Sequence, residues 1–142
     1  MPYTAPVSDG PSATGTLLPL DQGTLAAVIA SADGAFGAMH VNAEGILQCA
    51  SGIDRDRAEP AGAAAAAVAG VVRGLGAAVA AGRLPVLERV CCEFDGLTLL
   101  VQALADGSVI ALIGTEAADL GAMGYALSDL ATRLRSDHPS LH

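Results

Sequence analysis

The segment Pro60–Gly82 constrains this chain more than any other, because it reads PAGAAAAAVAGVVRGLGAAVAAG and consists mostly of Ala, Gly and Val. Ala is the best helix former, and Pro is well suited to a first helical position, where its missing N–H costs no hydrogen bond. Acidic residues precede the segment, and Gly82 followed by Pro85 is a helix-stop signal. The sequence therefore predicts one long helix over Pro60–Gly82.

This predicted helix carries two different rows of side chains. One row consists of branched residues at spacings of three and four, namely Val68, Val72, Leu75 and Val79. We expect this row to pack on a sheet. The other row has a small residue at every fourth position, namely Gly62, Ala66, Gly70, Gly74, Ala78 and Gly82. Gly inside a helix costs roughly 0.5–1 kcal/mol relative to Ala, so the second row calls for a compensating contact.

Three interpretations of the row of small residues remain open. It can be the face on which two copies of the chain meet, a consequence of an Ala/Gly-rich composition, or the G-x-x-x-G face of a membrane span. Arg73 lies at the centre of the segment, and Ala is only weakly hydrophobic, which argues against membrane insertion. Arg73 itself is either a solvent-facing residue that keeps the helix soluble or a contact to a partner.

Periodicity and turn residues predict the other elements. The expected helices are Asp21–Ala32 and Glu116–Arg135, and the expected strands are Ala35–Val41, Ile46–Ala50, Leu87–Phe94, Leu97–Leu104 and Val109–Ile113. Tight turns are expected at Asn42–Gly45, Asp95-Gly96 and Asp106-Gly107. The order α-β-β-α-β-β-β-α predicts a five-stranded antiparallel sheet with helices on both faces, a three-layer α/β sandwich. Residues 20–136 form the predicted domain, between flexible tails at 1–19 and 137–142.

Leu87–Phe94 is predicted to be a half-buried strand at a sheet edge. Its residues alternate, with Val90, Cys92 and Phe94 directed to one side and Arg89, Cys91 and Glu93 to the other. The strands expected at Leu97–Leu104 and Val109–Ile113 are apolar at nearly every position, so we expect them to lie inside the sheet.

Composition argues against several classes of function. The 142 residues carry a net charge of −8, with no Lys and no Trp, whereas nucleic-acid binding requires a basic face or stacking aromatic residues. A phosphate-binding P-loop is excluded because it needs Lys. His40, His138 and His142 share no metal-binding spacing, and the adjacent Cys91 and Cys92 point to opposite faces of a strand. We therefore predict no catalytic residue, cofactor or metal, and a cytoplasmic location because no signal peptide is apparent.

The pattern resembles the roadblock (dynein light chain) family, including bacterial members encoded beside small Ras-like GTPases. The resemblance spans roughly residues 20–136. It is carried by the hairpin Phe36–Ala50, the helix Pro60–Gly82, the hairpin Glu88–Leu104, the Asp106-Gly107 turn and Asp119-Leu120-Gly121.

This resemblance implies a profilin-like fold and a homodimer, in which the long helices pack together and the third strands pair. It also implies a non-enzymatic scaffold or regulator that binds a small Ras-like GTPase. The interface residues expected on this basis are Ala66, Gly70, Arg73, Gly74, Ala78, Arg89, Cys91 and Glu93. The alternative is a small-molecule sensor domain of the same fold, with an apolar pocket between sheet and helix.

Overall fold

The computed structural model describes residues 20–136; the tails predicted at 1–19 and 137–142 lie outside the described residues. The elements are α1 (Gln22–Ala30), β2 (Ala35–Val41), β3 (Leu47–Ser51), α2 (Arg55–Val79), β4 (Arg89–Phe94), β5 (Leu97–Ala103), β6 (Val109–Thr115) and α3 (Leu120–Ser136). Their order is the predicted α-β-β-α-β-β-β-α.

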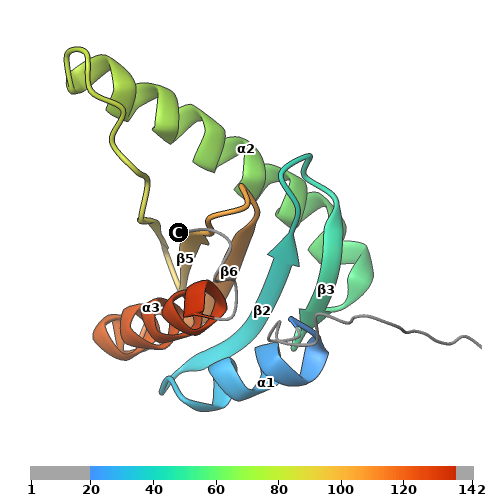
Figure 1. Cartoon of the computed structure of the whole chain (residues 1–142). Helices are drawn as coiled ribbons and strands as arrows, with labels where there is room; N and C mark the ends of the chain where they lie inside the picture. The colour runs from blue at the N-terminus through green and yellow to red at the C-terminus, as the bar shows by residue number, and fades with distance from the viewer. Residues whose placement is uncertain (1–19, 137–142) are drawn as a thin grey trace, which may run out of the picture.

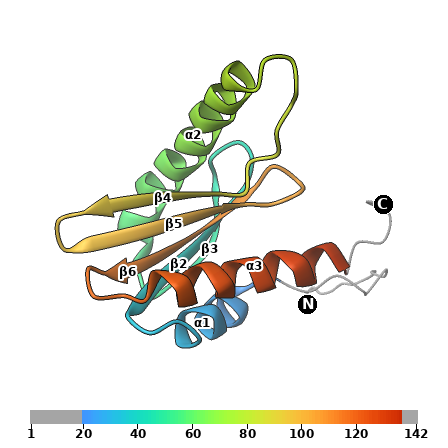
Figure 2. The same ribbon diagram turned by 90° about the vertical axis from the view of Figure 1, so that its left-hand side faces the viewer.

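The five strands form one antiparallel sheet in the order β3-β2-β6-β5-β4. Helices α1 and α3 cover one face of this sheet and α2 covers the other (Figures 1 and 2). The predicted three-layer sandwich is therefore confirmed. Strand β4 lies at one edge, as its alternation predicts, and the more apolar β5 and β6 lie inside the sheet.

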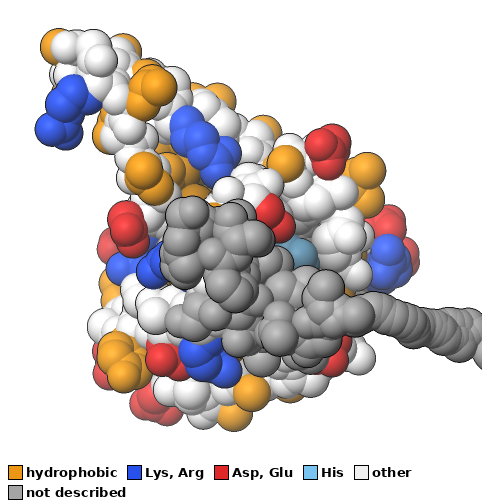
Figure 3. All heavy atoms as spheres, viewed as in Figure 1, with side chains coloured by type: hydrophobic (Ala, Val, Ile, Leu, Met, Phe, Trp, Pro, Cys, Tyr) orange, Lys and Arg blue, Asp and Glu red, His pale blue; other side chains and the backbone are white. Residues whose placement is uncertain are grey.

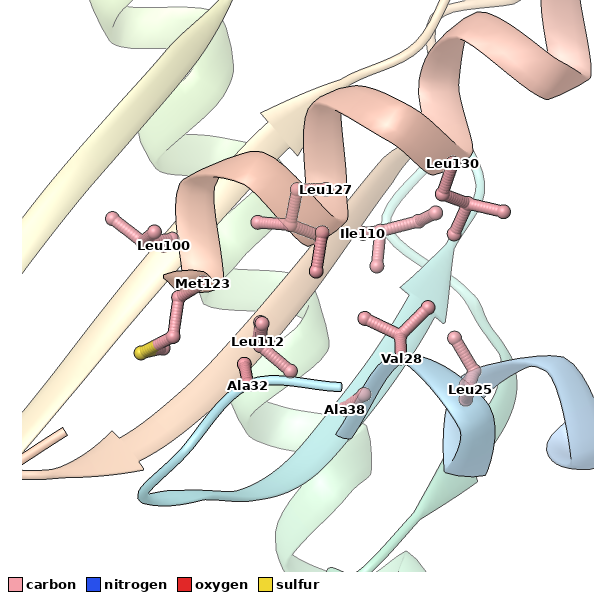
Figure 4. Close-up of a cluster of buried hydrophobic side chains, with 11 residues drawn as sticks. Leu25, Val28, Ala32, Ala38, Leu100, Ile110, Leu112, Met123, Leu127 and Leu130 are labelled. Atoms are coloured by element: carbon pink, nitrogen blue, oxygen red, sulfur yellow. The ribbon is translucent and has the colours of Figure 1, made fainter. Parts of the chain in front are cut away.

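The layer between the sheet and α1 and α3 is filled mainly by Leu, Ile, Val and Met side chains, with a few Ala between them (Figure 4). Met123, Leu127 and Leu130 form an apolar stripe on α3 and are fully buried against Ile110 and Leu112 of β6. Burying a side chain of this size contributes roughly 1.5–3 kcal/mol. The α3 stripe is thus the main element that fixes this face of the sheet.

The layer between the sheet and α2 is built differently, and here the sequence prediction is wrong. The residues of α2 that are buried against the sheet are small, namely Ala58, Gly62, Ala65 and Ala69. A Cβ on Gly62 would lie 2.9 Å from Cγ2 of Val41, so the helix backbone sits directly on strand β2. Because this close approach excludes larger side chains, the branched row of α2 points away from the sheet.

The N-terminus of α2 also differs from the prediction. Asp54 is the N-cap, and its carboxylate accepts a hydrogen bond from the backbone N–H of Arg57 at 3.0 Å. This cap starts the helix at Arg55, five residues before the predicted start, and leaves Pro60 inside the helix. Pro60 cannot donate to the carbonyl four residues earlier, but the cap and the buried Ala58 hold the first turns in place.

The C-terminus of α2 comes three residues before the predicted Gly82. The helix ends at Val79, and the next residues turn the chain back with positive φ angles of 54° at Ala81 and 98° at Gly82. The segment 80–88 then returns to the sheet and enters β4 (Figure 1). Helix and returning segment together form a projection beyond the sheet.

Candidate protein-interaction surface

The projecting part of α2 exposes a row of branched side chains. We call Val68, Val71, Leu75 and Val79 the α2 stripe; their exposed fractions are 37%, 74%, 61% and 75%. The C-terminal half of α2 extends past the edge of the sheet, so the sheet of the same protomer cannot cover this stripe (Figures 1 and 2). Apolar side chains gathered in this way mark a surface that another molecule covers.

The segment that follows α2 enlarges this apolar surface. Leu84 and Val86 are more than four-fifths exposed, and a Cβ on Gly76 would be 3.4 Å from Cγ of Pro85. An open groove of about 400 Å³ lies between the helix and this segment. It is lined by Val72, Arg73, Leu75, Gly76, Val79 and residues 85–89.

The projection is basic, although the protein as a whole is acidic. Between Glu59 and Glu88 the sequence has Arg73 and Arg83 and no acidic residue, and both arginines are exposed. Figure 3 shows blue and orange side chains along this part of the molecule, with red side chains elsewhere. The surface is therefore apolar with isolated positive charges.

Strand β4 presents an unpaired edge. The carbonyl of Glu88 accepts a hydrogen bond from Ala103 N–H at 3.0 Å, so Glu88 faces strand β5. Because hydrogen bonding alternates along an antiparallel strand, the backbone groups of Arg89, Cys91 and Glu93 face away from β5. These outward N–H and C=O groups are available to a further strand.

Arg89 links this edge to α3. One guanidinium nitrogen, Nη1, donates to Gln102 Oε1 at 2.7 Å, to Ser128 Oγ at 2.9 Å and to the carbonyl of Gly124 at 3.5 Å. All three acceptors are neutral, and no ion pair in residues 20–136 includes Arg89. The half-buried cation is thus held in position without a counter-charge.

The thiols of the chain are all free in the structure. Cys91 is exposed on β4, while Cys49 and Cys92 are half-buried. Burial, followed by the nearby Glu93 carboxylate, raises the pKa of the Cys91 thiol, which disfavours the reactive thiolate. Within residues 20–136, no group of three or more His, Cys, Asp or Glu side chains is placed to hold a metal ion.

A polar cluster of different character lies at the β5–β6 turn. Nε2 of His40 is 3.1 Å from Ser108 Oγ, and this hydroxyl donates to Asp106 Oδ1 at 2.6 Å. Burial lowers the pKa of His40, although the Asp106 charge opposes this shift. The Ser108 hydroxyl donates to the carboxylate, so it is not arranged as a nucleophile activated by His40, and the cluster ties the turn to strand β2.

The structure places the predicted interface residues on two elements. On α2, Gly70 and Gly74 have open space around the position of a Cβ, Arg73 and Ala78 are exposed, and Ala66 is half-buried. On β4, Cys91 and Glu93 are exposed and Arg89 is half-buried. Arg73 and Arg89 line the same groove.

Two members of the predicted small-residue row do not belong to this surface. Gly62 is buried against the sheet and Gly82 lies beyond the end of the helix. The sequence pattern assigns Val68, Leu75 and Val79 of the α2 stripe to the sheet and does not single out Val71, so it misses the stripe as part of the surface. The sequence feature that could reveal this stripe is the presence of apolar residues on more than one face of a single helix.

By length and composition alone, α2 could also cross a membrane, with a mean hydropathy of 1.6. Its N-terminal half, however, packs on the sheet through Ala58, Ala65 and Ala69. The helix is therefore, in part, a core helix of the domain, and its exposed portion carries Arg73.

Comparison with known proteins supports the fold. No family model and no curated protein matches the sequence. A Roadblock/LC7 domain from Streptomyces avermitilis matches the structure with a TM-score of 0.71 and 21% identity, over 84% of this chain and 96% of that chain. MglB of Myxococcus xanthus gives a TM-score of 0.70 at 14% identity, over 84% and 94%. Gliding protein MglB of Thermus thermophilus gives 0.65 at 16%, over 80% and 87%. The chain thus has the Roadblock/LC7 fold, which confirms the resemblance identified in its sequence.

Proposed function

We propose that this chain is a soluble, cytoplasmic, non-enzymatic scaffold that forms a homodimer and regulates a small Ras-like GTPase. The observation that carries the proposal is the pairing of two uncovered features on one side of the protomer, namely the α2 stripe and the free edge of β4. A second copy satisfies both features at once, because its own β4 supplies backbone partners and its own α2 supplies an apolar surface.

The position of α2 supports this arrangement. The helix packs on β3, β2, β6 and β5, and projects past the sheet instead of lying along β4. The side of β4 that carries Val90, Cys92 and Phe94 is therefore only partly covered, and Phe94 is 59% exposed. When two sheets join along β4, each projecting helix reaches over the β4 strand of the other copy.

The partner we propose is a small Ras-like GTPase. Similarity in fold to MglB and the family resemblance of the sequence support this choice. The projection offers Arg73 and Arg83 among apolar side chains, which suits a partner surface that is apolar with acidic groups. The dimer would act by position, as a rigid surface that orders the switch loops of the GTPase and alters its nucleotide state or its location.

The groove beside α2 does not favour the alternative of a small-molecule sensor. A sensor pocket of this fold is expected between the sheet and a helix, whereas this groove is open and lies on the projection. It is continuous with the α2 stripe through Leu75 and Val79, so a protein partner that covers the stripe also covers the groove.

Mixing the protein with the GTPase of its source cell is expected to give a complex on size exclusion or a changed rate of GTP hydrolysis. The GTPase should be tested in its GDP- and GTP-loaded forms, because an effect through switch loops depends on the nucleotide. Arg73→Glu is expected to weaken the effect at least tenfold, and Arg133→Glu on α3 is the matched control. The regulatory role is wrong if neither a complex nor a rate change appears.

Gly74→Leu is expected to weaken dimerisation about tenfold or more. A Cβ at Gly74 has no neighbour within 4 Å in the protomer, so the larger side chain is tolerated there and also favours the helix by about 1 kcal/mol. In a closely packed helix pair the same side chain prevents the approach of the second backbone. Analytical ultracentrifugation measures the change, with Ala27→Leu on α1 as the control. If dimerisation is unchanged, the glycines of α2 reflect the Ala/Gly-rich composition of the chain and not an interface.

A further inference from the structure

The free edge of β4 carries an ordered set of charges. Its three outward-facing residues are Arg89, Cys91 and Glu93, with the positive residue at one end, the negative residue at the other and the thiol between them. A strand with this order is complementary to its own antiparallel copy.

We infer that two copies pair along β4 with the two-fold axis at Cys91, so that Arg89 of each copy lies opposite the partner's Glu93. This inference rests on the proposed homodimer and adds its register. Residues directly opposite each other in an antiparallel pair project to the same face of the sheet. The register thus creates two equivalent ion pairs and brings the two Cys91 residues to a Cα separation of about 5.5 Å.

Other registers satisfy the edge less well. Centring the pair on Arg89 or on Glu93 places like charges opposite each other, which is unfavourable. Centring it on Val90 leaves Glu93 opposite Leu87, an apolar residue outside β4. Centring it on Cys92 places Arg89 opposite Asp95, which lies in the turn after β4 and not on the strand edge. The register centred on Cys91 pairs all three outward residues with one another, so each exchanges both of its free backbone hydrogen bonds across the axis.

The environment of Arg89 provides a second, independent argument. Its Nη1 donates only to neutral oxygens of Gln102, Ser128 and Gly124, and its other two nitrogens make no hydrogen bond within residues 20–136. A half-buried guanidinium is best satisfied by a carboxylate, because charge-assisted hydrogen bonds are about twice as strong as neutral ones. The partner's Glu93 can supply that carboxylate while the Nη1 contacts to α3 remain in place.

Cross-linking of single-thiol variants tests the register. Cys49 lies on β3, at the opposite edge of the sheet, and is replaced by Ser in both variants. Under mild oxidation, Cys49→Ser/Cys92→Ser is expected to give a disulfide-linked dimer through Cys91, because a Cα separation of about 5.5 Å suits a disulfide. Cys49→Ser/Cys91→Ser is expected to stay largely uncross-linked, because the two Cys92 residues are offset along the paired strands and lie about 8 Å apart. Light scattering is run in parallel. A dimer that cross-links through Cys92, or through neither thiol, overturns the register alone, whereas a monomer overturns the proposed dimer as well.

Charge reversal provides a test that does not depend on thiols. Glu93→Arg should weaken dimerisation at least tenfold, because each Arg89 then faces an Arg of the partner, and Arg89→Glu/Glu93→Arg should recover most of the affinity. Thermal unfolding confirms that each variant folds, which matters for Arg89 because of its contacts to α3. Unchanged dimerisation of a folded Glu93→Arg variant overturns the register.

Discussion

Leu75→Asp is expected to convert the proposed dimer into a monomer while leaving the protomer folded. Leu75 is 61% exposed in the protomer, so the new carboxylate remains in water there. In the dimer the same carboxylate would be buried between the apolar side chains of two α2 stripes. An unpaired buried charge costs about 3–5 kcal/mol, which weakens association by a factor of roughly 100 or more.

The matched control is Tyr125→Asp. Tyr125 is also a large, exposed side chain on a helix, with an exposed fraction of 76%, but it lies on α3, on the other face of the sheet. Light scattering after size exclusion should show Leu75→Asp at about the 14.0 kDa mass of one chain and Tyr125→Asp at twice that mass. A Leu75→Asp protein that is still dimeric at micromolar concentration would exclude the α2 stripe from the interface.

The order of elements and the sheet edges can be predicted from the sequence because their signals are local. Turn residues such as Asp95-Gly96 set the hairpins, and the alternation along Arg89–Phe94 marks a half-buried strand at a sheet edge. These signals depend on residues close together in the chain, so no knowledge of tertiary contacts is needed to interpret them.

The orientation of α2 cannot be predicted in this way. Both of its rows are apolar, and the rule that branched side chains face the core assigns Leu75 to the sheet. The contact between Gly62 and Val41 decides otherwise, because the helix lies so close to β2 that only small residues fit beneath it. That closeness depends on the strands of the whole sheet, which local periodicity does not encode.

The contact between Arg89 and α3 is beyond prediction from the sequence for a related reason. The hydrogen bonds of Arg89 join residues 13 and 39 positions further along the chain, Gln102 and Ser128. Gln102 lies opposite Arg89 in the β4–β5 register, whereas only the packing of α3 against the edge of the sheet brings Ser128 to Arg89. The sequence does predict the edge strand and its outward residues, and the structure adds the way in which one of them is anchored.

Gly52→Ala is expected to be the most destabilising small substitution in the loop between β3 and α2. Gly52 has a φ of 76°, and a Cβ at this position would overlap the carbonyl oxygen of Phe36 in β2. The left-handed backbone costs an Ala residue about 1–2 kcal/mol, and displacing a strand carbonyl adds about 1–3 kcal/mol. For a domain of this size, the total corresponds to a fall in Tm of about 5–15 °C.

Gly107→Ala separates the cost of the left-handed backbone from the cost of displacing the strand carbonyl. Gly107 has a φ of 90°, close to that of Gly52, but its Cβ would meet only Cβ of Ala43 at an ordinary 3.4 Å. It should therefore lose only the roughly 1–2 kcal/mol of backbone strain, or about 3–6 °C in Tm. Both variants are melted at the same protein concentration, because dimerisation makes Tm depend on concentration. Equal losses in the two variants would mean that β2 yields to the new methyl group, and that the joint between β2 and the start of α2 is not rigid.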